Sequence, residues 1–286
     1  MHSWTWIEHN GRPYLHCQLL EDWRHGFFTR DWWPQPPSSL VDAIAPDTHA
    51  YRVKQVHGNT VLTISEWQHH GQPKAEQTPS STESTQWPEA DGIVALQPTE
   101  AVWTASADCV PVLIADQVTG HVAAVHAGWR GTAQKIVPVA IQRLLDQGSQ
   151  LSNLRVALGP AIDGDVYQVS MAVAAEVGAT VAVHARQMSG SDDSVADTVQ
   201  SRSDEAIAHV LEVLQQLDPS AVFDDPQPGR VRLDVRRINK LQLDQLGVAP
   251  EQVAIAPYCT YRDEDRFFSY RRTHEKNVQW SGIVAN

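Results

Sequence analysis

Three segments of the chain combine a reactive side chain with a tight turn. KQVHGN (54–59) carries His57, TASADCVP (104–111) carries Cys109, and HVAAVHAGWRG (121–131) carries His126. Each of these residues lies where an apolar, strand-like run meets a turn, and such positions in a sheet protein commonly lie along one edge. Taken singly, each residue is more often structural. Together, two imidazoles and a thiolate form a ligand set that suits Zn²⁺ and leaves a fourth position for water or substrate, as in catalytic zinc sites.

The same residues also suit a chemistry that needs no metal. A cysteine and a histidine form a nucleophile and its general base when their side chains meet. The spacing of Cys109 and His126 alone favours neither the metal nor the thiol interpretation.

An anion-binding element follows His126. Gly128 and Gly131 form a turn that opens a helix, whose first backbone N–H groups are free, and Arg130 places a guanidinium beside them; this suits a phosphate or a carboxylate. Arg271 follows FFSY (267–270) on an expected late strand and is a second candidate for an anion contact.

Short strands and a few helices must position these motifs. Helical spacing of apolar residues predicts helices over 132–147, 205–217 and 235–246, the first with Thr132 as N-cap and Gly148 as its stop. β-Branched runs bounded by turns predict strands over 52–56, 61–64, 92–95, 101–106, 110–115, 122–126, 155–158 and 252–256. Because the strands come in runs and the chain contains neither GxGxxG nor GxxxxGK[ST], the pattern predicts an α+β fold with mixed β-sheets rather than a Rossmann sheet.

Length and composition fit one globular domain spanning residues 1–286. Two polar stretches, 68–90 and 186–203, are expected to be surface insertions within it. The chain has 22 Lys and Arg against 34 Asp and Glu, a formal net charge of −12. This acidity argues against a general nucleic-acid or anionic-membrane binder, both of which need a basic surface, but not against a small anionic ligand held by a few arginines.

The cysteines and the N-terminus favour a cytoplasmic protein. Cys17, Cys109 and Cys259 are widely spaced and form no CxxC pair, which argues against a disulfide framework. The N-terminal sequence MHSWTWIEHNGRPYLHC lacks the pattern of a secretory signal, and no apolar run reaches the length needed to cross a bilayer.

At these motifs the sequence resembles a known family. The segments KQVHG, ADGIVA, SADCVPVLI, AAVHAGWRG, LGPAI with VYQV, LDVRRINKLQLDQLGV and CTYRDEDRFFSYRR occur in the order typical of the YfiH-like family, also called the laccase-domain or polyphenol-oxidoreductase family. The resemblance extends from about residue 51 to the C-terminus. The chain departs from it at 27–37 (FFTRDWWPQPP), where the family commonly has a glycine-containing turn.

The resemblance implies an α/β/β/α sandwich with mixed sheets and a metal site whose ligands match His57, Cys109 and His126. It also implies a purine nucleoside phosphorylase that cleaves adenosine, inosine and S-methyl-5'-thioadenosine with phosphate, together with adenosine deaminase activity. Polyphenol oxidation and the editing of peptidoglycan precursors are further activities associated with the family.

Among these activities, we expect a zinc-dependent purine nucleoside enzyme. Zinc activates water for attack on an electron-poor ring carbon, as deamination requires, and Arg130, with Arg271 as a further candidate, would hold phosphate for phosphorolysis. One alternative is a copper-dependent polyphenol oxidase; Cu²⁺ would also bind an N/S site, but the chain has no HxH pair and only three methionines. The other is a metal-free amide hydrolase, such as a peptidoglycan-precursor editing factor, with Cys109 as nucleophile and His126 as base.

Overall fold

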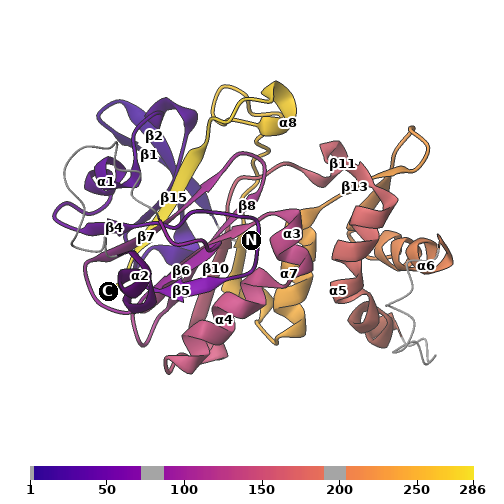
Figure 1. Cartoon of the computed structure of the whole chain (residues 1–286), viewed down its shortest axis with the longest axis horizontal. Coiled ribbons are helices and arrows are strands. Elements are labelled where there is room, and N and C mark those ends of the chain that lie inside the picture. The colour runs from indigo at the N-terminus through magenta and orange to yellow at the C-terminus, as the bar shows by residue number, and fades with distance from the viewer. Residues whose placement is uncertain (1–2, 72–86, 190–203) are drawn as a thin grey trace.

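The computed structural model describes residues 3–71, 87–189 and 204–286 (Figure 1). Within these ranges the strands form two six-stranded mixed sheets and one three-stranded sheet. Helices and strands both contribute to the fold, which confirms the predicted α+β class with mixed sheets.

The first sheet joins the two ends of the chain. Its order is β1-β2-β3-β15-β7-β4, so the C-terminal strand β15 lies between β3 and β7. Neighbouring strands are antiparallel except β4 and β7, which are parallel. The strands are β1 (Trp4–His9), β2 (Arg12–Cys17), β3 (His25–Phe28), β4 (His49–Tyr51), β7 (Glu100–Ser106) and β15 (Gln279–Val284).

The second sheet has the order β14-β10-β8-β9-β6-β5. The pairs β5–β6 and β10–β14 are parallel, and the other pairs are antiparallel. The strands are β5 (Val61–Thr63), β6 (Gly92–Ala95), β8 (Val110–Asp116), β9 (Val122–Ala127), β10 (Leu154–Leu158) and β14 (Val253–Ile255). Together with β7, these six strands confirm every predicted strand except the first.

The predicted strand over 52–56 is wrong. β4 ends at Tyr51, and Lys54 beyond it forms only an isolated bridge. The backbone N–H groups of residues 56–58 donate to the carboxylate of Asp91 instead of pairing with a strand. A buried side chain has therefore taken the hydrogen bonds that a sheet would have used.

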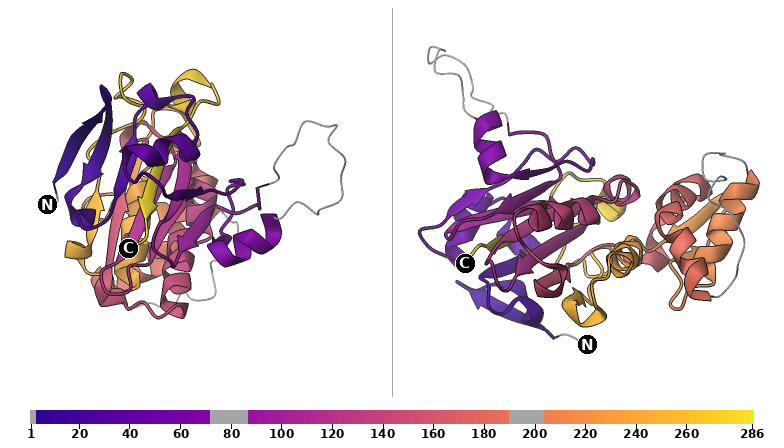
Figure 2. Two further views of the ribbon diagram at one scale, coloured as in Figure 1. Left: turned by 90° about the vertical axis from the view of Figure 1, so that its left-hand side faces the viewer. Right: turned by 90° about the horizontal axis from the view of Figure 1, so that it is seen from below.

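Three buried apolar clusters give the order of the layers. Alternate residues of the central strands face opposite sides: Val112 and Val125 pack toward the helices, whereas Leu113 and Ala124 pack toward the first sheet. A third cluster on the outer face of the first sheet packs against α1 (Pro37–Leu40) and the turn that follows it. The resulting order, helix, sheet, sheet, helix, confirms the α/β/β/α sandwich (Figures 1 and 2).

The helix predicted over 132–147 consists of two helices, α3 (Trp129–Ala133) and α4 (Ile136–Asp146). Lys135 between them has a left-handed backbone with φ of 57°, which interrupts the helical hydrogen bonds. Thr132 therefore lies inside α3, and Gly128 occupies the N-cap position. Gly148, with φ of +93°, ends this region as predicted.

The other predicted helices are confirmed as α6 (Asp204–Gln215) and α7 (Val235–Gln245). The expected late strand that would carry Arg271 is wrong, because Tyr270–Thr273 forms the short helix α8, with the Ser269 side chain accepting from the N–H of Arg272. Besides α8, three helices were not predicted: the short α1, α2 (Ile64–Gly71) and α5 (Met171–Ser189). The 3₁₀ turns are Gln18–Leu20, Arg30–Trp32, Val41–Ala43, Leu151–Asn153, Gly164–Val166 and Pro250–Gln252.

The third sheet lies with α5 and α6 at one end of the molecule (Figures 1 and 2). It is antiparallel, with the order β11-β13-β12, and its strands are β11 (Gln168–Ser170), β12 (Val222–Asp224) and β13 (Arg230–Leu233). Val169, Val231 and Leu233 belong to the same apolar cluster as β8 and β9, so this part shares the core of the second sheet.

The two expected insertions are described only at their ends. Residues 68–71 complete α2, and Ala90 is buried in the core between the two large sheets, while 72–86 lie outside the described residues. Residues 186–189 complete α5, and 190–203 lie outside the described residues. Within the described ranges, none of the helices has both the length and the apolar character needed to span a membrane.

Candidate metal centre

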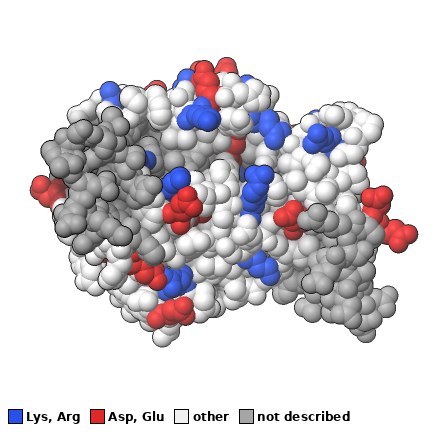
Figure 3. Space-filling view, viewed as in Figure 1, with Lys and Arg blue, Asp and Glu red and all other residues white. Residues whose placement is uncertain are grey.

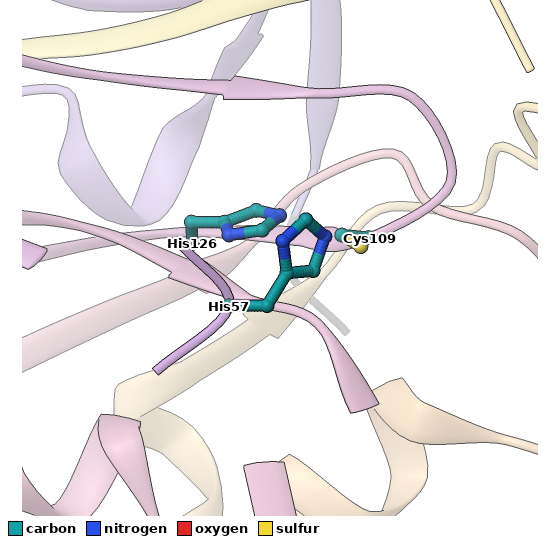
Figure 4. Close-up of side chains that lie close together, drawn as sticks. All are labelled: His57, Cys109 and His126. Atoms are coloured by element: carbon teal, nitrogen blue, oxygen red, sulfur yellow. The ribbon is translucent and has the colours of Figure 1, made fainter. Parts of the chain in front are cut away.

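The structure brings the three predicted ligands together. The candidate ligand atoms of His57, Cys109 and His126 all lie within 4.8 Å of one another (Figure 4). β8 and β9 are antiparallel neighbours, with Val110 opposite Ala127, so Cys109 just before β8 lies beside His126 near the end of β9. The imidazoles of His57 and His126 are 4.8 Å apart between ring centroids and nearly perpendicular, at 84°.

The carboxylate of Asp91, which lies just before β6, connects the two histidine segments. It accepts the backbone N–H groups of Val56, His57 and Gly58 at 3.1, 2.9 and 2.7 Å, and it lies 2.8 Å from Nδ1 of His126. The backbone N–H of His126 also donates to the carbonyl oxygen of Asp91, at 2.7 Å. With Nδ1 bound to this carboxylate, Nε2 of His126 is left to serve as a ligand or base.

The three candidate ligands differ in exposure and charge. His126 is buried, Cys109 is partly buried and His57 is exposed. Burial alone would raise the pKa of the Cys109 thiol, but the neighbouring His126 and His57 lower it to about 6. Burial would lower the pKa of His126, but the Cys109 thiolate and Asp91 raise it to about 9. The thiolate form, which is both the metal ligand and the nucleophile, is therefore favoured at neutral pH.

Gly128 leaves open the space between the three side chains. A Cβ atom at this position would lie 3.0 Å from Sγ of Cys109, 3.2 Å from Cδ2 of His57 and 3.6 Å from Cε1 of His126. The absence of a side chain thus gives an ion room among the ligands. Two nitrogens and one sulfur fit Zn²⁺, and they leave a coordination position for a reactant.

The two arginines expected to bind an anion each contact a different aromatic ring. The Arg271 guanidinium lies 4.9 Å from the Tyr167 ring centroid and donates to the carbonyl of Gln168 at 2.8 Å, while the exposed Arg130 lies over Trp129 at 4.4 Å. Within the described part of the chain, no carboxylate pairs with either arginine. Because α3 has only five residues, anion binding here would depend on the Arg130 side chain rather than on the helix.

Electrostatics link Tyr167 to both parts of the site. Burial above all, with the Cys109 thiolate and Asp108, raises the pKa of Tyr167 to about 12 against the opposing effect of Arg271 and Arg130. The phenol therefore keeps its proton at neutral pH and can donate a hydrogen bond. On the face shown in Figure 3, basic side chains lie singly among acidic and uncharged ones and form no continuous basic surface over the described residues.

Asp108, the acidic neighbour of Cys109, is buried and has a structural role. Its carboxylate accepts the hydroxyl of Thr260 at 2.7 Å and the backbone N–H of Arg271 at 2.7 Å. Asp108 thus ties the turn that carries Cys109 to the helix that carries Arg271.

Comparison with known proteins identifies the family. A family model described as multi-copper polyphenol oxidoreductase laccase matches residues 38–202 and 195–285. The chain belongs to this family. The resemblance seen in the sequence motifs is therefore confirmed.

Relatives support both the family and the fold. A purine nucleoside phosphorylase of Synechocystis sp. is 49% identical over 282 residues, which are 99% of this chain and 97% of that protein. An adenosine deaminase from an unknown prokaryotic organism is 26% identical over 167 residues, which are 58% of this chain and 51% of that protein. The crystal structure of YlmD from Geobacillus stearothermophilus has the same fold, with a TM-score of 0.72 over 98% of both chains at 21% identity.

Asp91 and Tyr167 also belong to the site, but the sequence analysis did not predict them as site residues. Asp91 lies in the ADGIVA segment, and a lone acid directly before a buried strand was the signal for it. Tyr167 lies in the VYQV segment, where a tyrosine beside short apolar residues has no distinguishing sequence feature.

Proposed function

We propose that the chain is a zinc-dependent purine nucleoside phosphorylase. It would cleave adenosine, inosine and S-methyl-5'-thioadenosine with phosphate. The observation that carries the proposal is the His57, Cys109 and His126 cluster in a chain 49% identical to a purine nucleoside phosphorylase over nearly its whole length. Cys17, Cys109 and Cys259 form no disulfide, which supports the proposal that the enzyme acts in the cytoplasm.

His57, Cys109 and His126 would hold the ion, with Cys109 as a thiolate and His126 oriented by Asp91. When bound, zinc supplies Lewis acidity, which favours attack on an electron-poor centre. The donor set suits Cu²⁺ as well, so the choice of metal is part of the proposal.

In phosphorolysis, this chain's own residues would bind and orient the phosphate. Arg130 and Arg271 carry positive charge that no carboxylate of the described residues neutralises, so both can bind a phosphate dianion. A phosphate oxygen forms a bond to C1′ of the ribose as the bond from C1′ to the purine nitrogen breaks. The electron pair stays with the purine, which takes up a proton. The Tyr167 hydroxyl keeps its own proton at neutral pH and would be able to donate a hydrogen bond to a bound substrate.

The same site would deaminate adenosine. Water adds at C6 of the purine and ammonia leaves, so this reaction needs no phosphate. A 26% identical adenosine deaminase that matches 58% of this chain supports this second activity.

One observation favours the metal-free alternative. The Cys109 thiolate and the protonated His126 form the ion pair that activates cysteine nucleophiles, so an amide hydrolase would use the same two residues. Chelation distinguishes the two proposals, because it removes a required zinc ion but leaves a Cys–His pair intact.

The test is to incubate the purified protein with each nucleoside, with and without phosphate, and to identify the products by mass. We expect free base and ribose 1-phosphate (5-methylthioribose 1-phosphate from S-methyl-5'-thioadenosine) only with phosphate, and inosine from adenosine without it. Chelation should abolish both reactions and zinc should restore them. If His126→Ala retains wild-type phosphorolysis, or if copper but not zinc restores activity together with phenol oxidation, the proposal is wrong.

A further inference from the structure

The side chain of Gln55 pairs with the backbone of β7 as a strand residue would. Its Nε2 donates to the carbonyl of Ala105 at 2.8 Å, and its Oε1 accepts the N–H of Ala105 at 2.8 Å. The hydroxyl of Thr104 also approaches Oε1, at 3.4 Å. One primary amide therefore satisfies both polar groups of Ala105, on the strand edge that β4 leaves free after Tyr51.

This pairing connects the loop of His57 to the strand that leads to Cys109. β7 ends at Ser106, three residues before Cys109. On its other side, the same loop is bound to Asp91, which also holds His126. Gln55 and Asp91 thus connect the His57 loop to the segments of both other candidate ligands.

His57 needs such support from its backbone. Its φ of 61° is left-handed, which is unfavourable for a residue with a side chain. Its imidazole is exposed, so packing does not fix the ring as it does for the buried His126. The position of the ring therefore depends on how the loop is held.

We propose that Gln55 is a positioning residue for the metal centre, whose pairing with Ala105 sets the backbone of His57 so that the imidazole completes the ligand set. The inference rests on the proposed zinc site. It differs from a purely structural role because it predicts a loss of zinc affinity in a protein that remains folded.

The test compares Gln55→Met with a matched control, Gln142→Met. Methionine has a similar shape but cannot form a hydrogen bond with either the N–H or the carbonyl of Ala105. The side chain of Gln142, on α4, donates to Asp146 at the surface. Zinc affinity is measured by competition with a chromophoric chelator on the metal-free proteins, and their folding by thermal unfolding. We expect zinc affinity to fall about 10- to 100-fold in Gln55→Met and to stay at the wild-type value in Gln142→Met.

The absorption spectrum of the Co²⁺-loaded protein gives a second readout, because it changes when a histidine ligand is lost. Should Gln55→Met fail to fold, Gln55→Glu keeps the acceptor for the Ala105 N–H but sets a carboxylate oxygen against the Ala105 carbonyl, and we expect a comparable loss of zinc affinity with a similar spectral change. Wild-type zinc affinity and an unchanged cobalt spectrum in either folded variant would overturn the role of Gln55 but leave the proposed zinc site standing. If the wild-type protein itself binds no zinc, the proposed metal centre fails and the inference fails with it.

Discussion

Nδ1 of His126 lies 2.8 Å from Oδ1 of Asp91, and the same oxygen accepts the backbone N–H of His57 at 2.9 Å. One carboxylate oxygen thus sets both the orientation of one imidazole and the backbone of the other histidine. Such a carboxylate beside a ligating histidine fixes its tautomer and increases its basicity. The candidate metal centre therefore depends on a residue that would not touch the ion.

Replacing Asp91 with asparagine should weaken zinc binding. Both oxygens of the Asp91 carboxylate accept hydrogen bonds, from His126 and from the backbone N–H groups of 56–58. The NH₂ group of asparagine would replace one of these oxygens and so point a donor at a donor. We expect zinc affinity to fall about 10- to 100-fold and the free energy of unfolding to fall by about 1–3 kcal/mol. Chelator competition and urea unfolding of the metal-free protein measure the two effects.

Glu89→Gln is the control for Asp91→Asn. Glu89 lies two residues earlier and pairs with Lys54 at the surface, at 2.9 Å. Exposed pairs of this kind contribute about 0–1 kcal/mol, so this variant should resemble the wild type. Asp91→Asn with wild-type zinc affinity would show that the carboxylate does not orient His126 for metal binding.

Replacing Arg271 with glutamine should separate the two proposed activities. If Arg271 binds phosphate, the KM for phosphate should rise about 10- to 100-fold, in line with about 1.5–3 kcal/mol for a hydrogen bond to a charged group. Deamination of adenosine, which uses no phosphate, should stay within about twofold of the wild type. Steady-state kinetics of both reactions are the measurement.

Arg155→Gln is the matched control for Arg271→Gln, because Arg155 binds the side chain of Gln117 and the backbone carbonyls of Ser152 and Leu154. An equal loss of both activities in Arg271→Gln would indicate that the variant disturbs Tyr167 and Gln168 instead of removing a phosphate contact.

The sequence was sufficient for the parts of the fold in which burial follows the local pattern. β8 and β9 are buried along their whole length, so their continuous apolar runs predict strands directly. β1 is an edge strand with no fully buried residue, so no apolar run marks it, although its Trp, Thr and Ile residues are typical of strands. The helix break at Lys135 was missed because the apolar spacing continues across it, although Pro138, which lacks a backbone N–H, indicated that a helix begins near this point.

Cys109 and His126 were predictable because they lie at adjoining ends of the neighbouring strands β8 and β9, whereas the strand expected to position His57 does not form. The supporting residues were not predictable, because these act over long sequence separations. Asp91 binds segments 34 and 35 residues away, and Gln55 binds a residue 50 positions away. Only the three-dimensional structure shows which backbone groups such side chains reach.

Alkylation of Cys109 should have an unusual pH dependence. Although burial raises the pKa of a thiol, His126 and His57 lower that of Cys109 to about 6. In the metal-free protein, the rate of reaction with iodoacetamide should therefore be half-maximal at about pH 6, falling below this pH as the thiolate takes up a proton. Cys17 and Cys259 are buried with raised pKa values, so they should react slowly in the folded protein.

Mass spectrometry of the labelled peptides over a pH series measures this dependence, with Cys109→Ser as the control. Zinc should protect Cys109 from the reagent. A midpoint near the ordinary thiol value of about 8.5 would mean that the two histidines do not stabilise the thiolate.

Replacing Gly128 with alanine should block the metal centre without unfolding the protein. The backbone of Gly128 has φ of −71°, which alanine adopts without strain. Its methyl group, however, would lie 3.0 Å from Sγ of Cys109 and 3.2 Å from Cδ2 of His57, tighter than ordinary contacts. We expect zinc affinity to fall at least about 10-fold, an effect of about 1.4 kcal/mol, and the free energy of unfolding of the metal-free protein to change by less than about 1 kcal/mol.

Gly58→Ala distinguishes this effect from that of an added methyl group in general. A Cβ atom at Gly58 would lie 3.7 Å from Oδ2 of Asp91 and 3.8 Å from Cγ2 of Val56, both ordinary contacts, on the same loop as His57. This variant should therefore bind zinc as the wild type does, in the same chelator competition. If Gly128→Ala also binds zinc with wild-type affinity, the space between Cys109 and His57 is not where the ion lies, and the ligand set would have to be reassigned.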